Sequence, residues 1–496
     1  MTDRLNRAVA SARHELLPGP DYDPADVVTG IAHIGVGGFH RAHQAMYVDR
    51  MLAEDPTWGI VGIGLRPEDR STLDELAAQD GTYSLTIVDP AQRETTRIIG
   101  SIVGTRHRDR EGAALLVSTL ADPAIRVVTL TITEGAYGID PDSGEYVPRD
   151  EAAVADMAGS ESPRSAMGLI VDALAARHRQ GHSPFAVVSC DNIPHNGAVS
   201  KAAVLGMARV RVPEIVSWIS AEVSFPSSMV DRITPAPTPA VREAVADAFG
   251  IEDACAVRSE SFVQWVLEDA FPHGRPPLGS AGVMMVEDVV PYELMKLRLL
   301  NASHQVMSYP ALLAGIEWVH DACSEPRVRS LMEQWMIAAT GTLPSVPGVD
   351  LDQYREDLLE RFSSPAVKDT LARQVAYSSD RIATFVRPAL DEMAVADQQR
   401  VGALVLALWG HWVRAQLSDA DDRWSDPRRD ELQAAIVREQ SDAAALLDVF
   451  DVVGEAGRNP EVRRVYCQIR ADLDRIPALE VIDQALAATP ASAAPQ

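Results

Sequence analysis

Residues 31–44, IAHIGVGGFHRAHQ, contain the pattern that decides the fold of the first half of this 496-residue chain. The apolar run at residues 31–34 predicts a short buried strand, and residues 39–52 predict a helix. The turn between them is rich in glycine. Such a turn lets the backbone approach a pyrophosphate, which the N–H groups at the helix start then bind. The stretch therefore predicts a dinucleotide-binding turn whose cofactor contacts come from Gly35, Gly37, Gly38, Phe39 and Arg41.

His40 departs from the standard fingerprint, which has a third glycine at that position. Considered alone, the glycines are explained equally well by a tight structural turn. The order of strand, glycine turn, helix and second strand favours a cofactor site, because this order begins a doubly wound α/β fold. The second strand is predicted at residues 58–64, WGIVGIG.

Two acidic residues, Glu68 and Asp69, follow the second strand. An acid at this place accepts hydrogen bonds from the adenosine ribose and repels a 2′-phosphate, which favours NAD over NADP. Arg66 and Arg70 lie beside these acids, and arginines here could instead accept NADP. Glu68 taken alone is equally consistent with an acid at a helix N-terminus.

Further strands are predicted at residues 83–88, 97–103, 126–133, 185–189, 261–268 and 282–290. Glu134 directly follows one of them, and the polar turn DNIPHNG (residues 191–197) follows another. Ligands of doubly wound sheets lie at the carboxyl ends of strands, so Glu134, Asp191 and Asn192 are expected near the cofactor. The turn has more polar side chains than a helix cap needs, which also favours a site.

The chain carries 45 basic and 71 acidic side chains, a formal net charge of −26. This charge repels nucleic acid and anionic membrane surfaces, so neither is expected as a partner. The N-terminus lacks the apolar core of a secretory signal, and the apolar run near residues 401–413 is too short to cross a bilayer. The four cysteines form no zinc pattern. These features predict a cytoplasmic protein with reduced thiols and no metal.

A second informative stretch is residues 291–309, PYELMKLRLLNASHQVMSY, which predicts one α-helix. Measured from Lys296 at about 100° per residue, Glu293 lies near 60°, His304 near 80° and Asn301 near 140°. The four polar side chains therefore share one stripe, which could line a groove for a short linear substrate.

Lys296 is one of only three lysines in the chain, so arginine supplies nearly all of its positive charge. Arginine cannot be deprotonated in a protein, whereas a desolvated lysine can titrate near neutrality. Lys296 is therefore a candidate general base. A surface ion pair with Glu293 is the alternative interpretation.

Several blocks together resemble the polyol-specific long-chain dehydrogenases, the mannitol 2-dehydrogenase family. They are IGVGGFHRAHQ, WGIVGIGLRPED, TLTITEGAY, SCDNIPHNG, FPSSMVDRITP, WVLEDAF and YELMKLRLLNASHQ. The similarity extends from about residue 28 to at least residue 390. The resemblance implies a metal-independent oxidoreductase that moves hydride between a polyol and a nicotinamide dinucleotide.

The resemblance also implies an α/β Rossmann-like dinucleotide-binding domain followed by a mainly α-helical C-terminal domain, with the site in the cleft between them. We place these domains at residues 28–290 and 291–488. Residues 1–27 are then an N-terminal lead-in, and the low-complexity end at residues 489–496 predicts disorder.

Residue roles follow from the same resemblance. Lys296 matches the general base, and Asn192 and Asn301 match the asparagines that hydrogen-bond the reacting oxygen. Asp231 and His304 match substrate-binding positions. Arg373 fits an arginine of the family, and Arg381 stands where lysine is common, which changes the reach of the charge. We further hypothesise that Glu134 and Glu293 lie near Lys296, raise its pKa and pass its proton to water.

The resulting prediction is NAD-dependent oxidation of a linear polyol such as D-mannitol or D-arabinitol, with the ketose as the reverse substrate. A uronate reductase acting on fructuronate or tagaturonate is an alternative, since Arg232, Arg373 or Arg381 could bind the extra carboxylate. A polyol-phosphate dehydrogenase is a third option, but the sequence shows no concentrated basic cluster that would favour it. A catalytically silent dinucleotide-binding regulator is the alternative from another class, against which the intact Lys296 argues. The chain can function as a monomer, and a dimer is left open.

Overall fold

The computed structural model describes residues 2–140, 143–365, 369–418 and 424–487. The chain divides into two compact units, Met1–Val290 and Pro291–Gln496. The tail predicted to be disordered, residues 489–496, lies outside the described residues. Among the helices described, none is both long and apolar enough to cross a bilayer.

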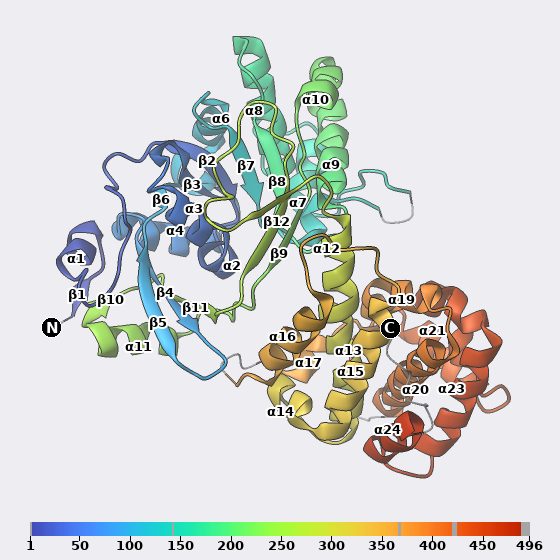
Figure 1. The fold of residues 1–496 in the computed structure, drawn as a ribbon. Coiled ribbons are helices and arrows are strands. Elements are labelled where there is room, and N and C mark those ends of the chain that lie inside the picture. The colour runs from blue at the N-terminus through green and yellow to red at the C-terminus, as the bar shows by residue number, and fades with distance from the viewer. Residues whose placement is uncertain (1, 141–142, 366–368, 419–423, 488–496) are drawn as a thin grey trace. The chain divides into compact units, whose positions relative to one another are not determined.

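Unit 1 is built on a parallel five-stranded sheet (Figure 1). In spatial order its strands are β6 (Ile102–His107), β3 (Gly59–Gly64), β2 (Thr29–Ile34), β7 (Val127–Leu130) and β8 (Ala186–Ser189). Ile34 pairs with both Ile63 and Leu130, and Leu130 pairs with Ser189. The carboxyl ends of β2, β3, β7 and β8 are therefore level. The strand order reverses direction at β2, which is where such sheets bind ligands.

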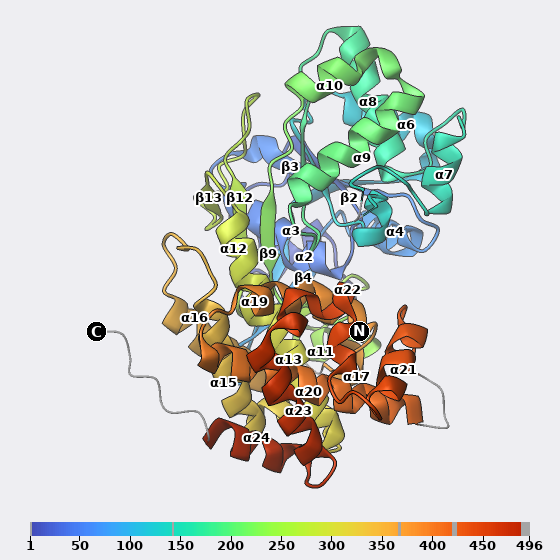
Figure 2. The same cartoon turned by 90° about the vertical axis from the view of Figure 1, so that its right-hand side faces the viewer.

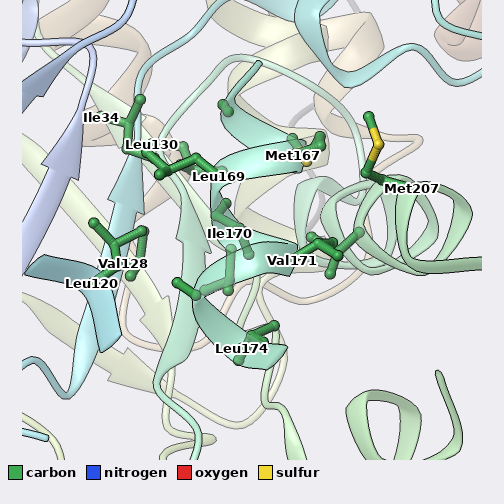
Figure 3. Packing of buried hydrophobic residues seen from close by; sticks show 14 of the residues in the cluster. Ile34, Leu120, Val128, Leu130, Met167, Leu169, Ile170, Val171, Leu174 and Met207 are labelled. Atoms are coloured by element: carbon green, nitrogen blue, oxygen red, sulfur yellow. The ribbon is translucent and has the colours of Figure 1, made fainter. Parts of the chain in front are cut away.

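Alternate side chains of the central strands pack against helices on the two faces of the sheet. On one face, Val128 and Leu130 belong to a buried cluster that includes Ile170 and Leu174 of α8 (Ala166–Gln180) (Figure 3). Helices α6 (Ala113–Ala121) and α9 (Asn196–Arg211) complete this layer. On the other face, Ile31 belongs to a second core that includes α3 (Gln44–Met51) and α4 (Asp69–Ala78).

Three smaller sheets extend unit 1. They consist of β11 (Val257–Glu260), β4 (Tyr83–Val88) and β5 (Glu94–Ile99); of β13 (Met284–Val286), β12 (Gln264–Glu268) and β9 (Ser228–Asp231); and of β1 (Asp3–Arg4) with β10 (Ile251–Glu252). Its other helices are α1 (Arg7–Ala12), α2 (Gly38–Ala42), α5 (Arg108–Glu111), α7 (Glu151–Met157), α10 (Val216–Glu222) and α11 (Pro239–Phe249). Leu5 and Leu17 are buried with Ile251, so the N-terminal segment contributes to a small core of its own.

Two predicted elements of unit 1 are divided in the structure. The helix expected at residues 39–52 is interrupted at His43 and forms α2 and α3. The strand expected at residues 97–103 is the end of β5 and the start of β6, separated at Gly100 and Ser101. β11 was not predicted, because its sequence VRSE is short and mostly polar.

Unit 2 is mainly α-helical, and α20 and α23 lie side by side in it (Figure 2). Trp335, Trp409 and Tyr466 are among its largest fully buried side chains. Its α-helices are α12 (Val290–Met295), α13 (Ala302–Leu313), α14 (Val319–Ser324), α15 (Pro326–Thr340), α16 (Leu351–Ser363), α17 (Leu371–Gln374), α18 (Ser378–Arg381), α19 (Arg387–Glu392), α20 (Ala396–Ser418), α21 (Arg429–Arg438), α22 (Phe450–Val453), α23 (Pro460–Leu473) and α24 (Ala478–Ala487).

The predicted helix at residues 291–309 is not a single α-helix. A π-helical segment, η4 (Lys296–Asn301), separates α12 from α13, and the N–H of Ala302 donates to the carbonyl of Leu297 five residues earlier. A second π segment, η5 (Ile382–Val386), lies between α18 and α19 and contacts η4. Single π turns inside α-helices are frequent at functional sites. Together, the Rossmann-like sheet of unit 1 and the helical unit 2 confirm the predicted fold class.

Candidate active site

The glycine turn at the end of β2 is as tight as the sequence predicted. Gly35 has φ +98, and a Cβ at this position would lie 2.1 Å from the carbonyl oxygen of Thr131 on the neighbouring strand end. The N–H of Gly37 donates to the carbonyl of Gly35 (2.7 Å), and α2 begins at Gly38. Only glycine fits at position 35, because any side chain would collide with backbone.

Two stacked imidazoles support this turn from inside the domain. His33 and His40 are fully buried, with ring centroids 3.4 Å apart. His33 Nε2 lies 3.1 Å from the Gly35 carbonyl, and its Nδ1 lies 2.7 Å from the Thr129 hydroxyl. Since a carbonyl only accepts, we assign the ring proton to Nε2. Burial lowers the pKa of His33 to about 3, so the ring is neutral. His40 thus fills the space where the fingerprint has its third glycine.

A cavity of about 670 Å³ opens at the carboxyl ends of β2, β3 and β7. This is the crevice in which doubly wound sheets bind dinucleotides. Its described lining consists of Ile34, Gly35, Leu65, Arg66, Pro67, Glu68, Asp69, Arg108, Thr131, Ile132, Thr133, Ala136, Asp150, Glu151, Ala152, Arg164, Ser165 and Ala166. The cavity therefore contains Gly35, Glu68 and Asp69 of the predicted cofactor residues.

The two acids after β3 have different surroundings. The Asp69 carboxylate accepts from the backbone N–H groups of Leu65 (3.1 Å) and Arg66 (3.0 Å), so it stabilises its own turn. Glu68 is exposed in the cavity wall. Arg70 is the arginine that the sequence left as a possible contact for NADP. Its Nε lies 3.4 Å from a carboxylate oxygen of Asp74 on the same helix. Glu68 is therefore the better placed of the two acids to meet a ribose.

Arg41 lies beneath the glycine turn and does not line the described cavity. Its side chain is 4% exposed, and it donates to the carbonyls of Gly37 (3.3 Å) and Cys255. Gly37, Gly38 and Phe39 are likewise outside the described lining. The guanidinium of Arg41 thus stabilises the turn by binding its backbone.

Asp191 ties the ends of β7 and β8 together. Its carboxylate accepts from the N–H groups of Ile132 and Thr133, each at 3.0 Å, and from the hydroxyl of Tyr137 at 2.7 Å. Burial raises the pKa of Asp191, and these hydrogen bonds oppose the increase. Thr133 has φ +70 and ψ 156, a conformation that is strained for a β-branched residue. Asp191 therefore fixes the strained segment that leads into Glu134, which is exposed.

The polar turn after β8 divides into an exposed part and a buried part. Asn192 is exposed, whereas Asn196 is buried and bonds the backbone of Ser228 in both directions. His195 caps α9 in a left-handed conformation with φ +54. Asp231, at the end of β9, is 5% exposed. Asn196 thus has a structural role, and Asn192 is placed where a ligand can reach it.

The π turn in unit 2 changes the helix geometry expected from the sequence. A π-helix turns about 82° per residue, so Asn301 lies about 50° from Lys296 and His304 about −10°, rather than 140° and 80°. Glu293 keeps its position near 60°, because the helix before Lys296 is α-helical. Lys296 and Glu293 are 8% and 7% exposed. The four side chains therefore share a narrower stripe than predicted.

His304 is surrounded by charged side chains and one aromatic ring. It packs edge-on against Phe362 with ring centroids 4.7 Å apart. Burial lowers the pKa of His304, and the nearby Asp369 carboxylate opposes this only in part. Arg373 donates to Asp369 through Nε at 2.7 Å and through Nη2. Arg381 donates to the carbonyl of Ala376, and its positive charge also lowers the pKa of His304.

Sequence reasoning missed two groups in this region. Asp369 neutralises Arg373, and its i,i+4 spacing from that arginine was a readable signal. Arg298, only 4% exposed, lies on the face of η4 opposite Lys296 and binds Glu392. A lone arginine among leucines could have indicated a buried anchor.

Comparison with known proteins assigns both halves of the chain. The Rossmann domain of mannitol dehydrogenase matches residues 29–280, and the C-terminal domain of mannitol dehydrogenase matches residues 288–476. The chain is 39% identical over 445 residues to a mannitol 2-dehydrogenase of Cereibacter sphaeroides, covering 89% of this chain and 92% of that protein.

Two further relatives bear on the ligands. A polyol:NADP oxidoreductase of Gluconobacter oxydans is 40% identical over 369 residues, covering 74% of this chain and 76% of that protein. The structure of Pseudomonas fluorescens mannitol 2-dehydrogenase in ternary complex with NAD and D-mannitol is 38% identical. It superimposes with a TM-score of 0.82 and covers 98% of this chain and all of that one. The chain belongs to the mannitol dehydrogenase family of oxidoreductases.

Proposed function

We propose that this chain oxidises a secondary alcohol of a linear polyol, such as D-mannitol or D-arabinitol, with NAD, and that Lys296 is the general base. The observation that carries the proposal is the stripe on η4 and α13. There a buried lysine shares one narrow face with Asn301 and His304. A lysine that is desolvated among apolar groups can act as a base near neutral pH.

Alcohol oxidation requires removal of a proton and a hydride from one carbon–oxygen pair. In our assignment Lys296 takes the hydroxyl proton, while the amides of Asn192 and Asn301 donate hydrogen bonds to the oxygen as negative charge develops. Bound NAD would supply the hydride acceptor. We assign Asp231, His304, Arg373 and Arg381 to the remaining hydroxyl groups of the substrate. Glu134 and Glu293 are assigned to proton release toward water.

NAD is the better candidate cofactor because Glu68 is exposed in the wall of the cavity and would repel a 2′-phosphate. Arg66, Arg108 and Arg164 line the same cavity and could attract that phosphate, which supports NADP as the second candidate. The name of the Gluconobacter relative agrees with this second possibility.

A uronate reductase is supported less well than a polyol dehydrogenase. Its substrate carries an additional carboxylate, which would need an available cation. Arg373 already forms an ion pair with Asp369, and Arg232 is 5% exposed and donates to the carbonyls of Ala42 and Glu260. A neutral polyol needs no such cation.

The test is NADH formation from NAD and a panel of polyols at alkaline pH, for the wild type, Lys296→Ala and the control Lys201→Ala. Lys201 is a lysine of unit 1 that donates to the Ser220 carbonyl. We expect turnover of mannitol or arabinitol in the wild type and the control, and its loss in Lys296→Ala with NADH affinity retained. NADH consumption only with fructuronate or tagaturonate would establish the uronate reductase instead. NADH binding without turnover of any substrate would establish the catalytically silent dinucleotide-binding regulator.

A further inference from the structure

One buried arginine holds the π turn from the face opposite Lys296. Arg298 follows Lys296 by two residues, which places it about 165° around the π-helix. Its guanidinium forms a bidentate pair with Glu392, in which both N···O distances are 2.8 Å. The same group donates to the carbonyl and the hydroxyl of Thr342, at 2.6 and 2.8 Å. Four hydrogen bonds therefore fix the side chain of Arg298, which lies on the face of η4 opposite the candidate base Lys296.

A second group binds the backbone of the same residue. The indole N–H of Trp335 donates to the carbonyl of Arg298 at 3.0 Å, and Trp335 is fully buried. Carbonyls inside a helix normally bond only to backbone N–H groups of the helix. A side chain that inserts into this ladder is a recognised cause of local distortion. Trp335 therefore binds η4 at a carbonyl inside the π turn.

We call Arg298, Glu392 and Trp335 together the clamp. The clamp also connects η4 to the second π segment, η5. Glu392 ends α19, which directly continues η5, and η4 and η5 are in contact. Arg381, assigned above to substrate binding, immediately precedes η5. The Arg298–Glu392 pair thus connects the two helices that carry the candidate base and one candidate substrate ligand.

We propose that Arg298, held by Glu392 and Trp335, is a positioning residue that maintains the π turn and so aligns Lys296, Asn301 and His304. This role rests on the proposed function of Lys296 as the base. If the turn relaxed to α-helical geometry, Asn301 and His304 would rotate by about 90° relative to Lys296. Misplacement of catalytic groups by about 1 Å can cost about 100-fold in rate. The clamp therefore acts on the rate rather than on cofactor affinity.

The first measurement is steady-state oxidation of mannitol by Arg298→Gln and Glu392→Gln. We expect kcat to fall by about 10- to 100-fold in Arg298→Gln and by a smaller factor in Glu392→Gln, with NADH affinity within about twofold of wild type. Glu333→Gln is the matched control, because it breaks another partly exposed arginine pair of unit 2, Arg329–Glu333. Unchanged kcat in both clamp variants would overturn the proposal.

A second measurement does not depend on turnover. The chain has three lysines, so labelling lysine with ¹³C at Cε gives three side-chain NMR signals, of which Lys296→Arg and Lys201→Ala identify two. We expect the Lys296 signal, and the pH at which it titrates, to change in Arg298→Gln and in Glu392→Gln, while the Lys201 signal stays. A Lys296 signal identical to wild type in both variants would refute the clamp.

The two measurements separate the clamp from the function on which it rests. If the wild type oxidises no polyol but the clamp variants move the Lys296 signal, the proposed function fails and the positioning role stands. If the wild type is active and the variants change neither kcat nor the signal, the positioning role fails alone. Should Arg298→Gln not fold, Glu392→Gln decides, because the Glu392 side chain is 54% exposed and its amide isostere is tolerated more readily.

Discussion

Acidification should destabilise unit 1 through His33. The pKa of this histidine is about 3 in the folded protein, because the ring is buried, against 6.5 for an exposed histidine. Between these values the unfolded chain binds one more proton than the folded chain. The stability associated with neutral His33 is therefore complete above pH 6.5 and is lost as the pH falls toward 3. From pH 7.5 to 5.5 this residue alone should cost about 1.4 kcal/mol of unfolding free energy.

The assay is urea unfolding of the wild type and His33→Gln at pH 7.5 and 5.5. Glutamine does not titrate, so the variant should lose about 1.4 kcal/mol less than the wild type between the two pH values. At pH 7.5 the variant itself should be less stable by about 1–3 kcal/mol, because the hydrogen bonds to Gly35 and Thr129 are disturbed. His273→Gln is the control, since His273 is an exposed histidine of the same unit. Equal losses in the wild type and His33→Gln would refute the reasoning.

Three further substitutions test the candidate site. Gly35→Ala places a Cβ 2.1 Å from the Thr131 carbonyl, so NADH affinity in a fluorescence titration should fall at least about tenfold; unchanged affinity would remove the glycine turn from the cofactor site. Glu68→Ser should raise the ratio of kcat/KM for NADP over NAD by about tenfold, and a ratio that does not rise would exclude Glu68 as the discriminating acid. Asp369→Asn releases Arg373 from its ion pair, so relative activity on fructuronate over mannitol should increase a few-fold; a ratio that does not increase would place Arg373 away from the carboxylate.

The sheet around β2 could be predicted from the sequence because its signals are local. A buried strand, a glycine turn and a second apolar strand are each encoded in fewer than ten residues. The order of these elements then restricts the fold to a few α/β arrangements. The α/β part of the confirmed fold class follows from this local information.

The helix break at His43 could not be predicted in the same way. Apolar spacing continues across residues 39–52, so periodicity gives one helix. In the structure the His43 ring stacks on Phe39 and contacts Trp265, which is more than 200 residues away, and its Nε2 lies 2.9 Å from the Gln264 carbonyl. These tertiary contacts fix the two short helices, and tertiary packing routinely overrides local preference.

The acids at the strand ends show a second limit. Sequence identified Asp69 and Asp191 by their position after strands, but not the groups that they bind. Both carboxylates accept from backbone N–H groups beside the cavity, which stabilises its walls. A carboxylate that is occupied by backbone donors has less capacity left for a ligand. Position along the chain therefore predicted the right region, whereas only the structure separates supporting residues from exposed ones such as Glu68.

The π turn is the feature on which the candidate site depends most, and hydrophobic periodicity is least sensitive to it. One extra residue in a turn changes the helix face by about 90°, yet the six residues KLRLLN, three of them leucine, fit an α and a π pattern equally well. The π geometry is distinguished from the α geometry by the distant residues that bond Arg298. They are Trp335, 37 residues away in the sequence, and Glu392, 94 residues away. A buried arginine on the leucine-rich side needs such partners, because an unpaired buried charge is strongly destabilising. If Arg298 has the proposed positioning role, the geometry of the candidate base Lys296 depends on contacts made on the other side of the helix.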